Sequence, residues 1–243
     1  MSFLIFEEKY RVGIEDIGED NLATNRAVFT YLEDIACVHA NSVNFGLLNS
    51  RRGSAHWILL SWNLHILKRP IYDEILTVRT WLESADRVSC IRDFDILNEK
   101  GECLAVASSR WVLMDLETRK IIKLTEEYIA DFGMEPDKKA LSEPLARFVE
   151  PVGYEFEMPY TVERRDIDLN NHVHNLNYLD IAYEMLPEDV YYHRVFNTVV
   201  IEYRKEVKYG DDVTCYYTAL EDGKKQVVTF KVSGNLSAAV VLE

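Results

Sequence analysis

The sequence predicts an α+β protein built from two copies of one unit, each a helix followed by an antiparallel sheet. Three observations support this. An apolar helix followed by strand-like runs lies early in the chain, the same order of elements returns later, and a proline-containing segment separates the two series. The chain has 243 residues, 48% of them hydrophobic and 12% aromatic, which suits one large core or two small ones.

The first predicted helix runs from Thr24 to about Asn44. Apolar residues recur along it at helical spacing, Thr24 is suited to cap it, and Gly46 ends it. Strand-like runs separated by turn-forming residues follow it: His56–Leu67, Ile75–Glu83, Arg87–Leu97 and Cys103–Asp115. This order predicts one helix followed by an antiparallel meander.

Residues 135–151 lose the alternation and contain three prolines, so we expect a linker between a first domain, 1–134, and a second domain, 152–243. In the second domain Val173–Leu186 is predicted as a helix closed by Pro187. Its expected strands follow in the same order as in the first domain: Thr198–Val207, Asp212–Leu220, Gln226–Ser233 and Ser237–Leu242.

Short stretches of the two halves resemble each other. Tyr31–Ala36 is similar to Tyr178–Ala182, and Tyr72–Thr77 is similar to Tyr209–Thr214. Both predicted helices are apolar nearly all round, as expected if a curved sheet wraps each of them. A long helix enclosed by a strongly bent antiparallel sheet is the hot-dog fold, so the sequence predicts a double hot-dog.

Composition excludes several classes of protein. With 27 basic and 41 acidic residues the net charge is −14, which argues against general binding to nucleic acid or to anionic membranes. We expect neither a signal peptide nor membrane insertion, because no apolar run is long enough. The four cysteines form no CxxC pair, which indicates reduced thiols and a cytoplasmic protein.

One polar segment precedes the second predicted helix. If it is extended, Asp168, Asn170 and His172 project to one side, next to free N–H groups at the helix start. A carboxylate, an amide, an imidazole and a helix terminus are the groups needed to hydrolyse an acyl derivative with water. The alternative is that these residues only cap and turn the chain. The first repeat has Asn25 and Arg26 in place of the histidine, so one copy is equipped for chemistry.

At these residues the chain resembles the acyl–acyl-carrier-protein thioesterases of plant plastids and bacteria. That family carries Asp-x-Asn-x-His-Val-Asn-Asn-x-x-Tyr, and this chain reads Asp168-Leu-Asn-Asn-His-Val-His-Asn-Leu-Asn-Tyr178. The family's Glu-Tyr-Arg-Arg-Glu-Cys strand is similar to Glu202–Val207. Further similar positions lie in the first half, at Thr80-Trp81, Arg92–Phe94 and Ser108–Met114.

The resemblance implies an enzyme of fatty acid biosynthesis, a hydrolase that releases free fatty acid from acyl–acyl carrier protein. Asp168 and His172 would orient and deprotonate water as a hydrogen-bonded pair, and Asn170 would position the water or polarise the carbonyl. Backbone N–H groups near Val173 and His174 would receive the oxyanion. Glu206 is a further candidate catalytic residue. Strict alternation would leave it as a solvated charge on the outer face of its strand, and a β-bulge would instead turn it toward the site.

Two departures from the family pattern bear on chemistry. Val207 stands in place of the family cysteine, so no thiol nucleophile can come from that position, and His174 replaces the first asparagine of the Asn-Asn pair. The resemblance places the acyl chain in the first domain, along the helix Thr24–Asn44 and the strand segment Trp57–Trp62. No cofactor is implied, and a metal site at His172 and His174 lacks the further ligands it would need.

The expected partner is acyl carrier protein, which is acidic, so docking needs local basic residues on an acidic enzyme. The candidates that flank the motif are Arg164, Arg165, Arg204 and Lys205. Two other functions stay open: an acyl-coenzyme A thioesterase, or a non-catalytic protein that binds acyl chains. A monomer and a homodimer are both compatible with two internal repeats.

Overall fold

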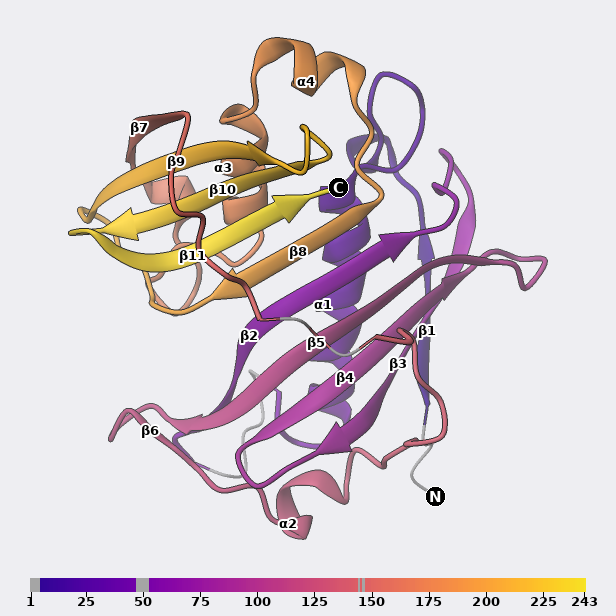
Figure 1. The fold of residues 1–243 in the computed structure, drawn as a ribbon. Coiled ribbons are helices and arrows are strands. Elements are labelled where there is room, and N and C mark those ends of the chain that lie inside the picture. Colours follow the sequence, from indigo (N-terminus) through magenta and orange to yellow (C-terminus); the bar gives the residue numbers. More distant parts are fainter. Residues whose placement is uncertain (1–4, 47–52, 144, 146) are drawn as a thin grey trace. The chain divides into compact units, whose positions relative to one another are not determined.

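A computed structural model describes residues 5–46, 53–143, 145 and 147–243 of the chain. The chain divides into two compact units, Met1–Leu145 and Ala146–Glu243 (Figure 1). Each unit combines a helix with an antiparallel sheet, so the predicted α+β double hot-dog fold is confirmed.

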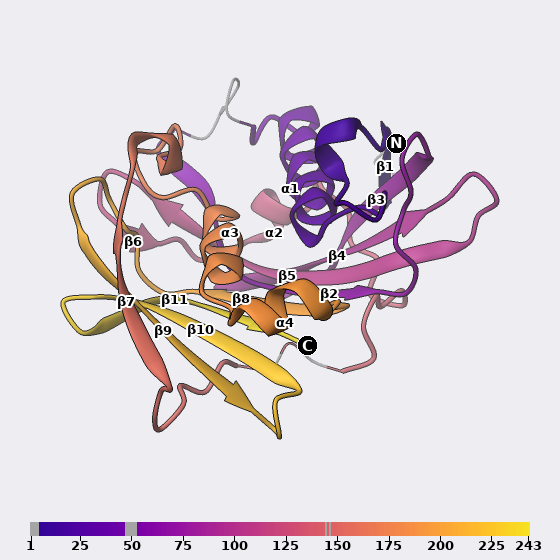
Figure 2. The ribbon, with the colours of Figure 1, turned by 90° about the horizontal axis from the view of Figure 1, so that it is seen from above.

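The first unit is built on helix α1 (Asn25–Ser42), which lies along one face of its sheet (Figure 2). Thr24 caps the helix as predicted, because its Oγ1 accepts a hydrogen bond from Ala27 N at 3.1 Å. Apolar residues on more than one side of α1 are buried: Ala27, Val28, Phe29, Tyr31, Leu32, Ile35 and Ala36. Burial of this width is what a sheet curved around the helix requires.

The sheet of the first unit runs in the order β1-β3-β4-β5-β2, and the short β6 pairs with β5. All its pairings are antiparallel. The strands are β1 (Phe6–Arg11), β2 (Ala55–Ile66), β3 (Ile75–Ala85), β4 (Ser89–Leu97), β5 (Cys103–Asp115) and β6 (Lys120–Ile121). A 3-10 turn, η1 (Ile14–Asp16), precedes α1, and a short helix, α2 (Glu126–Ile129), follows β6.

The second unit repeats this plan with the strand order β8-β11-β10-β9-β7. Its strands are β7 (Phe156–Thr161), β8 (Thr198–Tyr203), β9 (Asp212–Leu220), β10 (Lys225–Val232) and β11 (Asn235–Leu242). Helix α3 (Asn177–Glu184) packs on this sheet, with the rings of Tyr178 and Phe230 edge to face at 5.1 Å. A 3-10 turn, η2 (Arg164–Asp166), precedes α3, and a short helix, α4 (Glu188–His193), follows it.

Two predicted boundaries in the second unit are wrong. The helix begins at Asn177 and not at Val173, because Val173 N donates to Val207 O and His174 N donates to Asp166 O, both at 2.8 Å. Strand β8 ends at Tyr203 and not at Val207. Both differences fall on the candidate site, and they change its geometry.

The segment expected to be a linker is packed against the sheets at both of its ends. Trp81 Nε1 donates to Lys138 O at 2.8 Å, and Ala140 N donates to the buried carboxylate of Asp93 at 2.7 Å, both within the first unit. In the second unit, Phe148 N donates to Glu202 Oε2 at 2.8 Å. The boundary between the units therefore falls inside this segment, after residue 145.

Candidate active site

The polar segment before α3 is organised by a buried carboxylate. Asp166 is 6% exposed, and its Oδ2 accepts hydrogen bonds from Glu163 N at 2.7 Å and from the Tyr160 hydroxyl at 2.8 Å. Its carbonyl oxygen accepts a third from His174 N at 2.8 Å. These bonds fix the chain on both sides of the motif, so the loop between them has little freedom.

Asp168 holds that loop in a tight turn. Its Oδ1 accepts from Asn170 N at 2.8 Å and from His172 N at 3.2 Å, and Asp168 N donates to His172 O at 2.8 Å. Asn171 closes the turn in the left-handed region, at φ 63°, which asparagine tolerates better than most residues. The carboxylate of Asp168 therefore bonds the backbone, and the expectation that it pairs with the imidazole of His172 is wrong.

The imidazole of His172 instead contacts Glu206, with His172 Nε2 and Glu206 Oε2 3.0 Å apart. The two side chains are 20% and 31% exposed, so the pair is partly shielded and still open to a small molecule. The structure thus brings the side chains of two predicted site residues, an imidazole and a carboxylate, into direct contact. A carboxylate beside an imidazole can accept a proton from water and return it later.

Glu206 reaches His172 because the strand before it has ended. Arg204 N and Lys205 N both donate to Ser237 O, at 2.8 and 3.0 Å, so two residues oppose one as in a β-bulge. Val173 N then donates to Val207 O, which ties this segment to the loop of His172. The alternation that assigned Glu206 to the outer face of a strand does not apply, since Glu206 lies beyond β8.

The predicted oxyanion donors are already engaged. Val173 N and His174 N make the backbone hydrogen bonds described above, so neither is available to a substrate oxygen without breaking one. Asn170, by contrast, is exposed, and its Nδ2 lies 3.4 Å from Asp168 Oδ2. Its amide is therefore the better placed of the predicted groups to contact a substrate oxygen.

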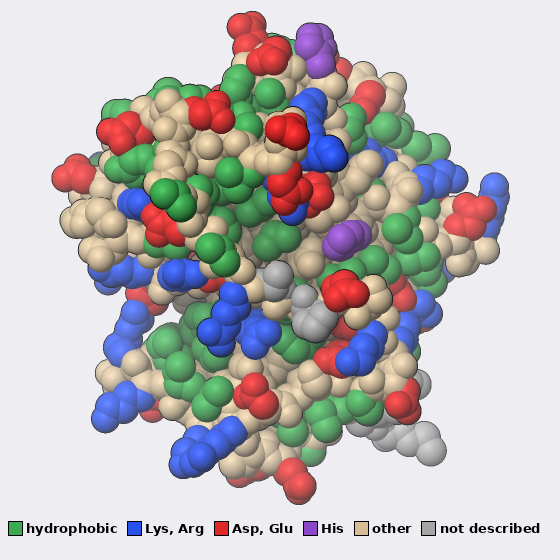
Figure 3. All heavy atoms as spheres, in the orientation of Figure 1, with side chains coloured by type: hydrophobic (Ala, Val, Ile, Leu, Met, Phe, Trp, Pro, Cys, Tyr) green, Lys and Arg blue, Asp and Glu red, His purple; other side chains and the backbone are tan. Residues whose placement is uncertain are grey.

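The four basic residues expected at a docking surface are exposed. Arg165 Nε lies 3.1 Å from Glu163 Oε2, and Arg204 pairs with Glu202 at 2.7 Å while also donating to Phe148 O at 3.1 Å. Acidic and basic side chains are interspersed on the face shown in Figure 3. Arg204 is thus partly committed to its own unit, and Arg164 and Lys205 are the more accessible cations.

The first unit contains the same loop without the chemistry. Gly18 N donates to Leu22 O at 2.9 Å, as Asp168 N donates to His172 O. Asn21 has φ 62°, close to the 63° of Asn171. Leu22 therefore takes the place of the histidine. The assignment of that place to Asn25 and Arg26 is wrong, because the sequence alone gave the repeat a register shifted by a few residues.

The counterpart of Glu206 in the first unit is a cation. Ala23 N donates to Pro70 O at 2.8 Å, as Val173 N donates to Val207 O, so Arg69 occupies the position of Glu206. The Arg69 guanidinium donates to Ala23 O and to Asn25 Oδ1, each at 2.9 Å. In the first unit this corner is a structural hydrogen-bond cluster, and only the second copy holds an acid–base pair.

None of the four cysteines has the depressed thiol pKa of a catalytic nucleophile. Burial is the largest influence on each, and it raises the pKa of Cys37 to about 11 and those of Cys90 and Cys215 to about 12; the pKa of Cys103 is raised as well. Val207, at the position of the family cysteine, is 1% exposed. No thiol is therefore present at that position.

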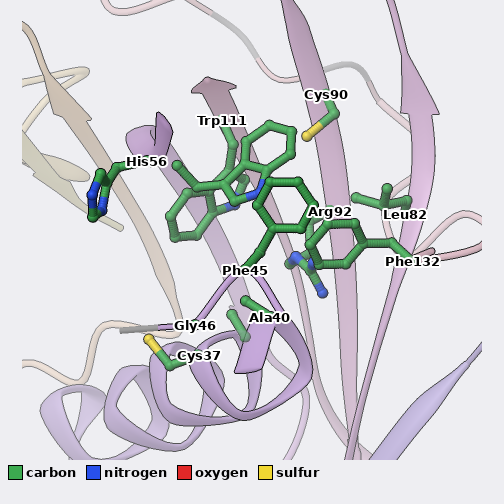
Figure 4. Close-up of a pocket in the computed structure, with 12 residues that line it drawn as sticks. Cys37, Ala40, Phe45, Gly46, His56, Leu82, Cys90, Arg92, Trp111 and Phe132 are labelled. Atoms are coloured by element: carbon green, nitrogen blue, oxygen red, sulfur yellow. The ribbon is translucent and has the colours of Figure 1, made fainter. Parts of the chain in front are cut away.

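A pocket lies in the first unit between α1 and the sheet (Figure 4). It encloses about 650 Å³, including its open mouth. Its lining is mostly apolar and aromatic: Ala36, Cys37, Ala40, Phe45, Gly46, His56, Trp57, Leu82, Cys90, Arg92, Trp111 and Phe132. The acyl chain was expected along the helix Thr24–Asn44 and the strand segment Trp57–Trp62. The lining includes residues of that helix and one residue of that segment, Trp57.

Two family models match this chain, one in each half. The family model for the acyl-ACP thioesterase N-terminal domain matches residues 4–132, and that for the acyl-ACP thioesterase C-terminal domain matches residues 149–239. The chain belongs to the acyl-ACP thioesterase family. The two matched regions together span most of the sequence, and they lie on either side of the boundary between the two units.

Two plant relatives share about a quarter of their aligned residues with this chain. Oleoyl-acyl carrier protein thioesterase 2 of Arabidopsis thaliana is 25% identical over 232 residues, covering 88% of this chain and 63% of the relative. The oleoyl-acyl carrier protein thioesterase of Coriandrum sativum is 25% identical over 258 residues, covering 99% and 69%. The chain thus spans about two thirds of the length of these plant proteins, both of which are described as chloroplastic.

Solved structures share the fold. The 12:0-ACP thioesterase from Umbellularia californica superposes with a TM-score of 0.88 at 19% identity, covering 100% of this chain and 98% of that one. An acyl-ACP thioesterase from Bacteroides thetaiotaomicron VPI-5482 gives 0.85 at 20% identity, covering 98% and 96%. Within the described part of this family member, no helix could span a membrane and no cluster of His, Cys, Asp and Glu could hold a metal.

Proposed function

We propose that this chain hydrolyses the thioester of acyl–acyl carrier protein and releases a free fatty acid. The observation that supports it most is the contact of His172 with Glu206 at 3.0 Å, in a loop fixed by Asp166 and Asp168. Family membership supplies the reaction class, and the pair supplies groups able to perform it.

In the proposed reaction the His172–Glu206 pair removes a proton from a water molecule. The oxygen of that water bonds to the thioester carbonyl carbon, and the carbonyl oxygen becomes an oxyanion. When the carbonyl re-forms, the carbon–sulfur bond breaks and the pair returns the proton to the departing sulfur. The products are the carboxylic acid and the thiol of the carrier, and no cofactor is consumed.

Asp168 and Asn170 have supporting roles in this proposal. Asp168 is a positioning residue, because its carboxylate holds the backbone N–H groups of Asn170 and His172 and so aims both side chains. Asn170 donates a hydrogen bond from its exposed side-chain amide to the oxyanion. Such a donor stabilises the charge of the transition state more than it stabilises the bound substrate. The N–H groups of Val173 and His174 keep their structural bonds throughout.

The partner in this proposal is an acidic acyl carrier protein. A net charge of −14 repels an acidic partner, so encounter depends on local cations close to the reacting pair. Arg164 and Arg165 lie in η2, four residues or fewer before Asp168, and Lys205 adjoins Glu206. We propose these residues, with Arg204, as the docking surface, whether the protein acts as a monomer or a homodimer.

The test is turnover of carrier-linked acyl chains of about eight to eighteen carbons, the span of ordinary fatty acids, assayed for free acid and free thiol together. The proposal predicts equal amounts of both products from at least one chain length. Hydrolysis of acyl-coenzyme A without hydrolysis of acyl–acyl carrier protein would show that the protein is an acyl-coenzyme A thioesterase. No release from any thioester, with acyl chains still bound, would contradict the proposal and favour a binding protein.

A further inference from the structure

The pocket of the first unit contains one charged side chain in an otherwise apolar wall. Arg92 comes from β4 and is 6% exposed. Figure 4 shows its guanidinium beside the ring of Phe132, and the guanidinium carbon lies 5.3 Å from the centre of that ring. Arginine is rarely buried this deeply without an acidic partner, so its surroundings need an explanation.

The protein partners of Arg92 are neutral. Its Nη1 lies 3.0 Å from His39 Nδ1 and donates to Thr80 Oγ1 at 3.1 Å. Burial, and then the charge of Arg92, lower the pKa of His39 to about 3, so this imidazole is uncharged near neutral pH and its Nδ1 accepts. Burial lowers the pKa of Arg92 to about 10, which leaves the guanidinium charged.

One donor in this pocket lacks an acceptor, and Arg92 uses only part of its guanidinium. Arg92 makes both of its hydrogen bonds to described residues from Nη1. The indole Nε1 of Trp57, also in the pocket lining, is buried and has no partner in the same described part of the chain. A buried cation and an unpaired N–H group are costly unless something else supplies an acceptor.

We propose that the pocket binds an acyl chain that carries an oxygen acceptor remote from its thioester, and that Arg92 recognises this oxygen. The aliphatic part of such a chain fits the walls formed by Phe45, Leu82 and Trp111. A hydroxyl or a carboxylate on the chain would supply an acceptor for the guanidinium of Arg92, whose partners in the protein are neutral. This inference rests on the proposed function in taking an acyl chain as the ligand of the first unit.

Tryptophan fluorescence can test the pocket without any hydrolysis. All four tryptophans, Trp57, Trp62, Trp81 and Trp111, belong to the first unit, and two of them line the pocket. Three matched ligands of equal carbon number are titrated: a fatty acid methyl ester, its ω-hydroxy derivative and its ω-carboxy derivative. In all three ligands a methyl ester replaces the C1 carboxylate, so the ligands differ only in the group at the ω end.

The expected result is a dissociation constant about tenfold or more lower for an oxygen-bearing ligand, the effect of one hydrogen bond to a charged group. Tighter binding of the carboxylate alone identifies an anion as the ligand group, and equal gains identify a neutral acceptor. Equal affinity for all three ligands, or tightest binding of the unmodified chain, would overturn the proposal. This comparison uses the wild-type protein, so it does not depend on a variant that folds.

Variants then assign the effect to one residue. Arg92→Met keeps an unbranched apolar side chain without the guanidinium and should abolish the preference for oxygen-bearing ligands, while Arg87→Met, at an exposed arginine of the same unit, should leave it unchanged. His172→Ala separates the two proposals, because it should stop hydrolysis and leave ligand binding intact. A preference that survives Arg92→Met would overturn the role of Arg92 even if the enzyme hydrolyses thioesters as proposed.

Discussion

The buried His39–Arg92 contact makes the stability of the first unit depend on pH. His39 is 3% exposed and stacks on Phe6 with ring centres 4.7 Å apart. Burial is the main cause that lowers its pKa in the folded protein to about 3, from the ordinary value of 6.5. Between these two values the unfolded chain binds a proton that the folded chain does not, so stability rises with pH across this window and is lost as the pH falls.

The size of this effect follows from the two pKa values. Between pH 7 and pH 5 the unfolded histidine becomes almost fully protonated while the folded one stays neutral, which removes about 2 kcal/mol of stability. His39→Gln cannot titrate, and its amide oxygen can still accept from Arg92. We therefore expect the variant to lose about 2 kcal/mol less than the wild type over the same interval.

The assay is urea unfolding followed by tryptophan fluorescence, which reports on the first unit because all four tryptophans lie there. Phe6→Leu is the matched control: it removes the ring stacked on His39 and should lower stability at both pH values without changing the difference between them. If wild type and His39→Gln lost equal stability between pH 7 and pH 5, the neutral buried histidine beside Arg92 would be refuted.

Three further predictions concern the second unit and the thiols. Charge reversal in Arg164→Glu with Arg165→Glu should raise the KM for carrier-bound substrate several-fold and spare small thioesters, because it removes local attraction to an acidic partner; equal effects on both substrates would exclude a docking role. Iodoacetamide at neutral pH should label Cys215, which is fully buried and whose pKa is raised to about 12, far more slowly than an exposed thiol; mass spectrometry measures the labelling, and fast labelling of Cys215 in the folded protein would contradict a buried, unreactive thiol. Asn171→Ala should lower the free energy of unfolding by about 1 kcal/mol and reduce hydrolysis, since φ 63° disfavours a β-carbon, whereas Asn171→Gly should keep both; equal behaviour of the two variants in thermal unfolding would show that the turn is not strained.

Strands with one buried face could be predicted from the sequence almost to the residue. Cys103–Asp115 and Asp212–Leu220 have the bounds that their alternation predicts. The edge strands β1 and β7 could not be found in this way, because both are mostly exposed, β1 is mostly charged, and β7 contains Pro159. An edge strand is defined by its neighbour, and local composition does not reveal that neighbour.

The sequence predicted which residues form the candidate site but not how they are arranged. The motif resemblance singled out His172 and Glu206, but alternation carried past Tyr203 gave Glu206 the wrong direction. The bond from Val173 N to Val207 O, across 34 positions, decides both where β8 ends and where α3 begins. Such long-range backbone pairing leaves no local signal in the sequence.

Arg92 shows the same limit in the first unit. In the sequence it is one charge within a strand, for which exposure is the usual outcome. Its burial follows from the register of β4 between β3 and β5, which turns it toward α1 and His39. A deeply buried cation can be recognised only when the partners on other elements are known.

The His172–Glu206 pair is the central claim, and a double-mutant cycle tests it most directly. Hydrolysis of acyl–acyl carrier protein is measured for His172→Ala, Glu206→Gln and the double variant, with His193→Ala and Glu157→Gln as exposed controls of the same residue types. If the two residues act as one unit, each single variant should lower kcat about a hundredfold or more. The double variant should then be little worse than either single variant, and the controls should match the wild type. Rates near wild type for the single variants, or losses that multiply in the double variant, would contradict a catalytic pair.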